Sequence, residues 1–568
     1  MAAPLLDLQD LTIAFRVGHG IAPGVEGINL RVERGEIVAL VGESGSGKSI
    51  TALSILRLLP SPPAHYLSGK ILFTDQTGRQ ADLLTQSPRD MQRIRGREAA
   101  MIFQEPMSSL NPVFTCGFQV TEAIRAHEKL TAGEARKRSI DLFEKVRLPD
   151  PSGIYSRYPH QLSGGQKQRV MIAMAMSCHP SLLICDEPTT ALDTTVQKTI
   201  LQLIRELQQA ANMGVLFITH DLGVVAEIAD RALVMYKGGV VEEGKVKDLF
   251  SHPTHPYTRG LLNCRPALHS KGMRLPVVSD LIQAPGAARV QPIEDRGETI
   301  RYDQSLVEVR NLRVWYPART NWHGKAIGHT KAVDDVSFDV YKGETLGLVG
   351  ESGCGKTTLG RALMRLTEPT AGQILFNGTN LGAYGAARLK QLRKDIQIIF
   401  QDPYSSLNPR LTIGSAITEA LKVHNLSGGK RGRRQRVEEL LQKVSMRPEH
   451  FGRYPHEFSG GQRQRIVIAR ALSLNPTFIV CDESVSALDV SVQAQVLNLL
   501  NDLKKEFGFT IVFISHDLSV VRYISDRIMV MNKGRIEEIG DAESLYDHPQ
   551  TEYTRRLIAA IPAASIRK

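Results

Sequence analysis

The sequence of 568 residues has no closely spaced cysteines and only two tryptophans. Its six cysteines are scattered, and no two of them have the C-x-x-C spacing that is typical of a zinc site. Cys185 and Cys481 lie in apolar stretches just before an Asp-Glu pair. We therefore expect free, buried thiols in a reducing compartment.

Long apolar runs and a leader peptide are also missing. No run approaches the roughly 20 apolar residues that a membrane-spanning helix needs. The N-terminus, M-A-A-P-L-L-D-L-Q-D, has no basic region, and Asp7 and Asp10 interrupt its apolar residues, which excludes a signal peptide. We expect the chain to stay in the cytoplasm and to reach a membrane only through a partner.

The length of the chain and its net charge limit the number of domains and the class of partner. A chain of this length is too long for one hydrophobic core, so at least two domains are expected. The net charge is +11, from 70 basic and 59 acidic residues. A basic balance fits nucleic acid, anionic lipid or nucleotide as a partner. The basic residues are mostly dispersed, which disfavours nucleic acid.

One phosphate-binding motif is present twice. Gly42–Ser49 read G-E-S-G-S-G-K-S, and Gly350–Thr357 read G-E-S-G-C-G-K-T. Both fit the pattern G-x-x-x-x-G-K-[S/T], in which a glycine-rich turn directs backbone N–H groups at nucleotide phosphates. Lys48 and Lys356 are 308 residues apart, a distance that indicates a duplicated domain and not a solenoid repeat.

The sequence around each glycine loop predicts an α/β fold. Each half opens with short alternating strands, and the apolar runs E-I-V-A-L-V-G and E-T-L-G-L-V-G then lead into the loop, which a helical pattern follows. Later apolar runs (S-L-L-I-C and V-L-F-I-T, T-F-I-V-C and I-V-F-I-S) alternate with helical patterns, as in a parallel sheet. Charged helical patterns at about 105–160 and 402–456 predict an inserted helical subdomain in each half.

A fixed series of motifs follows each glycine loop. It consists of a glutamine, an S-G-G-Q turn, an Asp-Glu pair after an apolar strand, and a histidine at a strand end. The first half has Gln104, Ser163–Gln166, Asp186, Glu187 and His220; the second has Gln401, Ser459–Gln462, Asp482, Glu483 and His516. The two S-G-G-Q serines are 296 residues apart, and so are the two histidines, so the register is intact.

This ordered series resembles the ATP-binding-cassette (ABC) ATPases, with two cassettes fused in tandem. The segments H-P-Y-T-R-G-L-L and E-Y-T-R-R-L-I, with S-S-L-N-P after each glutamine, are similar to the dipeptide, oligopeptide and nickel importer branch, whose fused members serve peptide, glutathione and microcin-like import. The resemblance implies two P-loop NTPase domains, each with a RecA-like parallel-sheet core, an antiparallel β subdomain and a helical subdomain. The implied domains are 1–262 and 306–546, with a linker or docking segment at 263–305 and a tail at 547–568.

The resemblance also implies the cofactors ATP and Mg²⁺ and a role for each motif. The lysines bridge the β- and γ-phosphates, the glutamates polarise the attacking water, and the histidines contact the γ-phosphate. The implied catalytic residues are Glu187, Glu483, His220 and His516, and the implied Mg²⁺ residues are Ser49, Gln104, Asp186, Thr357, Gln401 and Asp482. The implied ATP-binding residues are Phe15, Gly42, Ser44, Gly45, Ser46, Gly47, Lys48, Ser49, Ile50, Gln104, Ser163, Gly164, Gly165, Gln166, Tyr316, Gly350, Ser352, Gly353, Cys354, Gly355, Lys356, Thr357, Thr358, Gln401, Ser459, Gly460, Gly461 and Gln462.

Two of these implications concern geometry. The S-G-G-Q turn of each half is implied to close over the glycine loop of the other half, so that neither ATP site is complete alone. Phe15 and Tyr316 are candidates to stack on adenine, although a core aromatic is the alternative and Trp315 is adjacent to Tyr316.

The implied partners are two transmembrane permease subunits and a periplasmic or extracellular solute-binding protein, at the cytoplasmic face of a bacterial inner membrane. A tandem cassette that acts on the ribosome is the first alternative, but it predicts a long charged helical linker. A DNA-repair cassette predicts zinc cysteine pairs and a coiled coil, which the sequence lacks. No nucleic acid is therefore expected, and the solute (peptide, glutathione, microcin-like, opine or nickel) stays open.

The two halves also differ. Ser484 follows the second Asp-Glu pair where Pro188 follows the first, and Phe458 replaces Leu162. Neither change removes a catalytic group, so both sites are expected to hydrolyse ATP, with unequal rates left open. The near-copy L-S-G-G-K at 426–430 is predicted to be a basic loop and not a third site. Only Cys264 follows the H-P-Y-T segment, which disfavours an iron–sulfur centre there.

Overall fold

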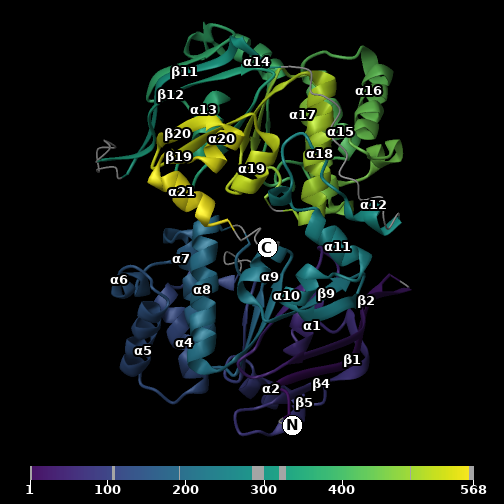
Figure 1. Cartoon of the computed structure of the whole chain (residues 1–568), viewed down its shortest axis with the longest axis vertical. Helices are drawn as coiled ribbons and strands as arrows, with labels where there is room; N and C mark the ends of the chain where they lie inside the picture. The colour runs from purple at the N-terminus through teal and green to yellow at the C-terminus, as the bar shows by residue number, and fades with distance from the viewer. Residues whose placement is uncertain are drawn as a thin grey trace. The chain divides into compact units, whose positions relative to one another are not determined.

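The protein is described by a computed structural model that covers residues 3–18, 20–104, 109–190, 192–283, 300–318, 328–486 and 488–561. Two compact units divide the chain, the first with Met1–Leu192 and Val196–Leu262 and the second with Asn263–Ile561. Each unit has a four-stranded sheet, a six-stranded sheet and a set of helices (Figure 1). The E-P-M-S residues after Gln104 and the alanine of each A-L-D motif lie outside the described residues.

The first unit contains the sheets that its alternating and apolar patterns predict. The antiparallel sheet has the order β2-β1-β4-β5, with β1 Leu6–Val17, β2 Gly20–Val32, β4 Ala64–Thr74 and β5 Gln80–Asp82. The second sheet has the order β10-β9-β3-β8-β7-β6, with β3 Ile37–Val41, β6 Ala99–Ile102, β7 Leu182–Asp186, β8 Gly214–Thr219, β9 Arg231–Tyr236 and β10 Gly239–Lys245. Its strands are parallel except β10, which pairs with β9 in the antiparallel sense. Every residue of β3, β7 and β8 is buried, as in a sheet covered on both faces.

The helices of the first unit complete this arrangement. They are α1 Lys48–Ile55, α2 Pro88–Ile94, α4 Cys116–His127, α5 Ala132–Lys145, α6 Pro151–Tyr155, α7 Gly164–Ala175, α8 Thr194–Ala211, α9 Leu222–Ile228, α10 Val246–Ser251 and α11 Pro256–Asn263. Helices α4, α5 and α6 form the inserted helical subdomain that the charged pattern predicts (Figure 1).

The second unit repeats the plan. Its antiparallel sheet has the order β12-β11-β14-β15, with β11 Arg301–Pro317, β12 His329–Lys342, β14 Ala371–Phe376 and β15 Thr379–Asn380. Its mixed sheet has the order β16-β17-β18-β13-β19-β20, with β13 Thr345–Val349, β16 Ile396–Ile399, β17 Phe478–Asp482, β18 Thr510–Ile514, β19 Arg527–Asn532 and β20 Arg535–Asp541. Its helices are α13 Lys356–Leu363, α14 Ala386–Asp395, α15 Ile413–Val423, α16 Gly429–Lys443, α17 Gly460–Leu472, α18 Val490–Phe507, α19 Leu518–Ile524, α20 Ala542–Asp547 and α21 Glu552–Ala559.

The L-S-G-G-K stretch is only partly the predicted loop. Helix α16 begins at Gly429, inside the motif, after two residues with positive φ, Ser427 (62°) and Gly428 (37°). The polar residues that follow are good helix formers, and the apolar positions Val437, Leu440 and Leu441 are buried with helical spacing. The prediction of a loop therefore fails from residue 429 onward.

Residues after α11 pack on the second unit. This segment includes a 3₁₀ turn at Pro266–Leu268 and helix α12 (Val278–Gln283). The side chain of Asn498 in α18 pairs with the backbone of Leu275, accepting from its N–H at 3.1 Å and donating to its C=O at 2.9 Å. Tyr523 in α19 donates to the carbonyl of Met273 at 2.8 Å. We call residues 264–283 the strap.

Among the described residues, no helix is both long and apolar enough to cross a membrane. None of the six cysteines forms a disulfide and all six are buried, as the sequence predicts for Cys185 and Cys481.

Candidate nucleotide-binding and hydrolysis site

The glycine loop of each unit lies between the central strand and the helix that follows it. Strand β3 ends at Val41 and α1 begins at Lys48, so the loop ends at a helix N-terminus, which favours anions. The last loop glycines, Gly47 and Gly355, have φ of 105° and 110°. A Cβ on Gly355 would lie 2.0 Å from the carbonyl oxygen of Ala332, so only glycine fits there.

The loop lysines rest on loop carbonyls. Lys48 Nζ donates to the carbonyl oxygens of Gly42 at 2.7 Å and Glu43 at 2.8 Å. Lys356 makes the same two bonds, to Gly350 at 2.7 Å and to Glu351 at 3.0 Å. Both lysines are only 4% exposed. Two cations are thus held inside the loops, where phosphates are expected.

A hydroxyl and a carboxylate meet at the start of each loop helix. Ser49 Oγ donates to Asp186 Oδ1 at 3.2 Å, and Thr357 Oγ1 donates to Asp482 Oδ1 at 3.0 Å. Burial, with the nearby Glu187 charge, raises the pKa of Asp186 to about 6 against the lowering effect of the Ser49 bond. Burial likewise raises the pKa of Asp482.

These oxygens fit Mg²⁺. The described residues contain no group of three or more His, Cys, Asp and Glu side chains that could enclose a metal ion. Mg²⁺ typically takes one or two protein oxygens and completes its shell with substrate phosphates and water. The hydroxyl–carboxylate pairs match that chemistry, and a bound cation would stabilise the buried carboxylates.

The glutamate after each aspartate is held from several sides. Glu187 Oε2 accepts from Gln104 Nε2 at 3.1 Å and from Thr190 Oγ1 at 3.0 Å, and it lies 3.2 Å from His220 Nδ1. Its backbone has φ of 46°, and its N–H donates to the carbonyl of Ile218 at 3.0 Å. A positive φ in a non-glycine residue indicates a constrained position.

The second glutamate has a similar but smaller set of partners. Glu483 Oε2 accepts from Gln401 Nε2 at 2.8 Å and lies 3.4 Å from His516 Nδ1, and its φ is 49°. Ser486, at the position of Thr190, donates to the main-chain carbonyl of Glu483 at 2.9 Å. The carboxylate therefore lacks the bond that Thr190 gives to Glu187.

Each glutamate is kept charged by the histidine and the loop lysine of its own unit. Burial alone would raise the pKa of Glu187 and Glu483, but the adjacent histidine and the loop lysine lower both. Burial would lower the pKa of His516, but the Glu483 carboxylate raises it. Each glutamate is therefore ionised at neutral pH and can accept a proton from water, which is the requirement for a general base.

Each S-G-G-Q turn is a helix N-cap. Ser163 Oγ accepts from the Gln166 N–H at 3.3 Å, while Gln166 Oε1 accepts from the Ser163 N–H at 3.0 Å. Ser459 and Gln462 repeat this capping box at 3.4 and 3.1 Å. Both serines are exposed, so each turn presents a helix N-terminus at the surface of its own cassette.

The two candidate adenine-stacking residues occupy matching places on the first strand of each antiparallel sheet. The Phe15 ring lies against Gly24, because a Cβ on that glycine would be 2.6 Å from the ring. Tyr316 is 42% exposed as a whole residue. Trp315 is already engaged, since its Nε1 donates to Asp334 at 3.2 Å. Stacking on adenine stays a prediction for Phe15 and Tyr316.

The structure thus groups glycine loop, Gln, Asp-Glu pair and His within each unit. Sequence reasoning missed Thr190, whose hydroxyl bonds the glutamate in the first unit only. The signal was available, because threonine at 190 and serine at 486 are another difference between otherwise matching motifs.

Comparison with known proteins agrees with this geometry. The family model described as ABC transporter matches residues 25–190 and 333–486, and the model for the oligopeptide/dipeptide transporter C-terminal region matches residues 241–285. The glutathione import ATP-binding protein of Salmonella choleraesuis (strain SC-B67) is 50% identical over 565 residues, covering 99% of this chain and 90% of that protein. The protein of the same name from Escherichia coli (strain K12) is 50% identical over 568 residues with the same coverage.

A solved dimeric bacterial ABC transporter cassette is 28% identical and covers 42% of this chain and 98% of its own, with a TM-score of 0.38. The two matches of the ABC transporter model coincide with the two units that hold a glycine loop and an Asp-Glu pair. The near full-length identity to the relatives extends over both units. The chain therefore belongs to the ABC transporter family, as an ATPase subunit with two cassettes and an oligopeptide-transporter C-terminal region.

Proposed function

We propose that this chain is the ATP-hydrolysing, energy-coupling subunit of a bacterial importer for peptide-like solutes. The observation that carries this proposal is the ionised, hydrogen-bonded glutamate that lies next to the lysine-bearing glycine loop in both cassettes. The names of the relatives, which describe glutathione import, favour glutathione or a similar small peptide as the solute.

The chemistry follows from the positions of the side chains. Lys48 and Lys356, held on their loop carbonyls, bind the β- and γ-phosphates of ATP. Ser49 with Asp186, and Thr357 with Asp482, hold Mg²⁺, which neutralises phosphate charge when bound. Glu187 and Glu483 orient the attacking water and accept its proton, and the histidines fix the glutamates and contact the γ-phosphate.

The family resemblance implies that the S-G-G-Q turn of one cassette completes the ATP site of the other. The exposed, capped turns at Ser163 and Ser459 suit this role, because a helix N-terminus offers N–H donors to a γ-phosphate. ATP then links the two cassettes, and hydrolysis releases them. Replacing Ser459 should impair the site of Lys48, whereas loss confined to the site of Lys356 would contradict the pairing.

Surfaces next to the two motif glutamines suit a membrane partner. Phe103 and Phe400 precede Gln104 and Gln401 and are 40% and 36% exposed. In the first cassette Phe114 and Phe118 also lie exposed, with their rings stacked 4.9 Å apart. Exposed aromatic groups of this kind mark interaction sites.

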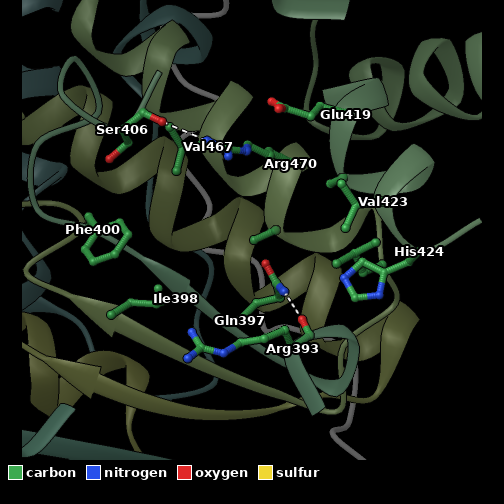
Figure 2. Close-up of a pocket in the computed structure, with 13 residues that line it drawn as sticks. Arg393, Gln397, Ile398, Phe400, Ser406, Glu419, Val423, His424, Val467 and Arg470 are labelled. Carbon is green, nitrogen blue, oxygen red and sulfur yellow. Dashed lines mark hydrogen bonds between the residues drawn. The ribbon is translucent and has the colours of Figure 1, made fainter. Parts of the chain in front are cut away.

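The second cassette has a hollow at this position. It has a volume of about 350 Å³ and lies between β16, α15 and α17. Figure 2 shows Phe400, Ile398, Val423 and Val467 with Arg393 and Arg470 around it. We propose that a cytoplasmic helix of a permease subunit occupies it, with a periplasmic or extracellular solute-binding protein delivering the solute on the other side of the membrane.

The experiment is a paired biochemical test. Purified protein should hydrolyse ATP in the presence of Mg²⁺, and the double variant Glu187→Gln/Glu483→Gln should bind ATP without turnover. The chain should sediment with membranes that contain its permeases and support glutathione uptake into vesicles. Sedimentation with ribosomes or DNA instead, or unchanged turnover in the double variant, would refute the proposal.

A further inference from the structure

The tyrosine shared by the two tail segments reaches the glycine loop. Tyr257 lies in α11 and Tyr553 in α21, and they are 296 residues apart, the same spacing as the S-G-G-Q serines. Tyr257 is fully buried, and Tyr553 is 8% exposed. The spacing and burial place both tyrosines inside the repeated architecture and not in a peripheral tail.

Each phenol oxygen accepts a hydrogen bond from the backbone of the loop. Tyr257 Oη accepts from the Glu43 N–H at 3.0 Å, across 214 residues of sequence. Tyr553 Oη accepts from the Glu351 N–H at 3.2 Å, across 202 residues. These glutamates are the second residue of each phosphate-binding motif, so the same loop amide is held in both cassettes.

The bound amide belongs to the peptide that also holds the lysine. The carbonyl of Gly42 shares a peptide plane with the Glu43 N–H, and it accepts from Lys48 Nζ at 2.7 Å. In a planar trans peptide the N–H and C=O groups point in opposite directions. Fixing the N–H on the phenol therefore directs the carbonyl toward the lysine. The Gly350 carbonyl and Lys356 repeat this at 2.7 Å.

The hydroxyl contact persists although the ring's neighbours change. In the first cassette the Tyr257 ring packs on Tyr236 of β9, with centroids 4.3 Å apart. The position that matches Tyr236 in the second cassette, 296 residues on, is Asn532. The aromatic packing partner is lost there, but the bond from Tyr553 to the loop amide is kept, so the hydroxyl is the common feature.

We propose that Tyr257 and Tyr553 are positioning residues for ATP binding, which orient the first peptide of each glycine loop and thereby the loop lysine. This inference rests on the proposed function, in which the lysines bind the phosphates. Without the phenol, the Glu43 or Glu351 amide loses its acceptor and the peptide is free to rotate. ATP must then order the loop as it binds, which weakens binding.

The test uses the full chain with one glycine loop active at a time. Lys356→Ala leaves the first loop to report nucleotide binding, and Lys48→Ala leaves the second. In these backgrounds Tyr257→Phe and Tyr553→Phe remove one hydroxyl each. ATP and ADP affinities should fall about 5-fold at the loop that each tyrosine contacts, the size expected for one neutral hydrogen bond. In the otherwise unaltered chain the KM for ATP should rise with little change in kcat.

A second readout separates positioning from general destabilisation. Hydrogen exchange of the Glu43 amide in nucleotide-free protein should speed up in Tyr257→Phe and stay unchanged in Tyr553→Phe, with the reverse at Glu351. Tyr236→Phe is the matched control, because it removes a hydroxyl from the ring packed on Tyr257. It should change neither affinity nor exchange.

The outcomes are distinct. Unchanged affinity and exchange in both phenylalanine variants would overturn the inference, and so would equal losses at both loops or in the Tyr236 control. Failure of the unsubstituted chain to bind ATP would instead refute the proposed function. Amide exchange in the nucleotide-free protein would still show whether the tyrosines hold the loop.

Discussion

The two cassettes place their catalytic glutamates on the same backbone but surround them differently. Glu187 and Glu483 have φ of 46° and 49°, and each is held by a glutamine and a histidine. Thr190 adds a third bond to the Glu187 carboxylate, whereas Ser486 bonds the main chain of Glu483. The duplicated framework is therefore kept, while the polar groups that set the charge and orientation of each glutamate have diverged.

A second difference concerns the aspartate that bonds the first residue of the central strand in each cassette. Asp526 of the second cassette accepts from the N–H of Thr345, the first residue of β13, at 2.6 Å, and it pairs with Lys504 and with Lys271 of the strap. Its counterpart Asp230 accepts from the N–H of Ile37 at 2.9 Å. The Asp526 side chain is 8% exposed and that of Asp230 is 47% exposed. The second cassette therefore has buried ion pairs at this aspartate, one of them with the strap, whereas the ion pair of Asp230 with Arg205 lies at the surface.

The largest effect that tests the comparison is on hydrolysis. Glu187→Gln and Glu483→Gln, combined, should lower ATP turnover by about 100-fold or more, because the pair removes the general base of both sites, whereas each single variant should lose only the turnover that its own site contributes. Since Thr190 orders only the first glutamate, Glu187→Gln should be the more damaging. ATPase rates at saturating ATP measure this, and ATP affinity, which should be retained, is the control. Equal rates would show that the sites work as one unit.

The next effect is on stability. Asp526→Asn leaves Lys271 and Lys504 without a carboxylate in a buried site, which should cost about 3 kcal/mol of unfolding free energy. Asp230→Asn should cost about 1 kcal/mol or less, because its partner Arg205 is 3.6 Å away and both groups are half exposed. Denaturant unfolding of the two variants measures the difference, and equal costs would contradict a role for the strap.

The Asp526 ion pairs should also depend on pH. Burial would raise the pKa of Asp526, but the charges of Lys504 and Lys271 lower it below its ordinary value. A carboxylate with a lowered folded-state pKa stabilises fully above its unfolded pKa of about 4. The advantage over Asp526→Asn should therefore hold from neutral pH down to about pH 4 and shrink as the pH falls further. An advantage that grows in acid would disprove this account.

A smaller effect is expected when Thr190, the third hydrogen-bond donor to the Glu187 carboxylate, is removed. Thr190→Ala removes one hydrogen bond to the Glu187 carboxylate and should lower turnover at the first site about 5-fold, measured in the Glu483→Gln background. Ser486→Ala removes only a bond to the main-chain carbonyl of Glu483 and should leave turnover nearly unchanged. Steady-state ATPase assays measure both. If Ser486→Ala were the more harmful, the assignment of Thr190 as the difference between the sites would be wrong.

The smallest effect concerns the helical subdomains. Thr121 Oγ1 bonds Ser139 at 3.0 Å and Tyr155 at 3.1 Å, whereas its counterpart Thr418 has a buried hydroxyl with no partner among the described residues. The ring at the matching place in the second cassette is Phe451. Phe451→Tyr should therefore stabilise that cassette by about 1 kcal/mol, and Tyr155→Phe should destabilise the first by a similar amount. Thermal unfolding of both variants tests this exchange.

Local sequence predicted the parts of the site that are close to a strand end. The glycine loops, Asp-Glu pairs and histidines each follow a short apolar run, and the parallel register brings the ends of such strands together. The φ values near +46° at Glu187 and +49° at Glu483 were not readable, because no glycine or asparagine marks them.

Contacts between segments that are distant in the chain could not be predicted from the sequence. The strap has no clean periodicity, and its anchors on Asn498, Asp502, Tyr523 and Asp526 are at least 200 residues away in sequence. The start of α16 was also missed, because glycines at 428 and 429 look like a turn while the residues after them determine a helix.

The border between the two physical units falls between Leu262 and Asn263, before the last residue of α11 and inside the 241–285 match to the transporter C-terminal region. Anyone who separates the cassettes for study must therefore cut within one family module. A first-half fragment that ends after residue 283 would carry Leu275, Val278 and Leu281, which are buried in the intact protein, as a newly exposed apolar surface. A second-half fragment that begins after that point would lose Lys271 from Asp526.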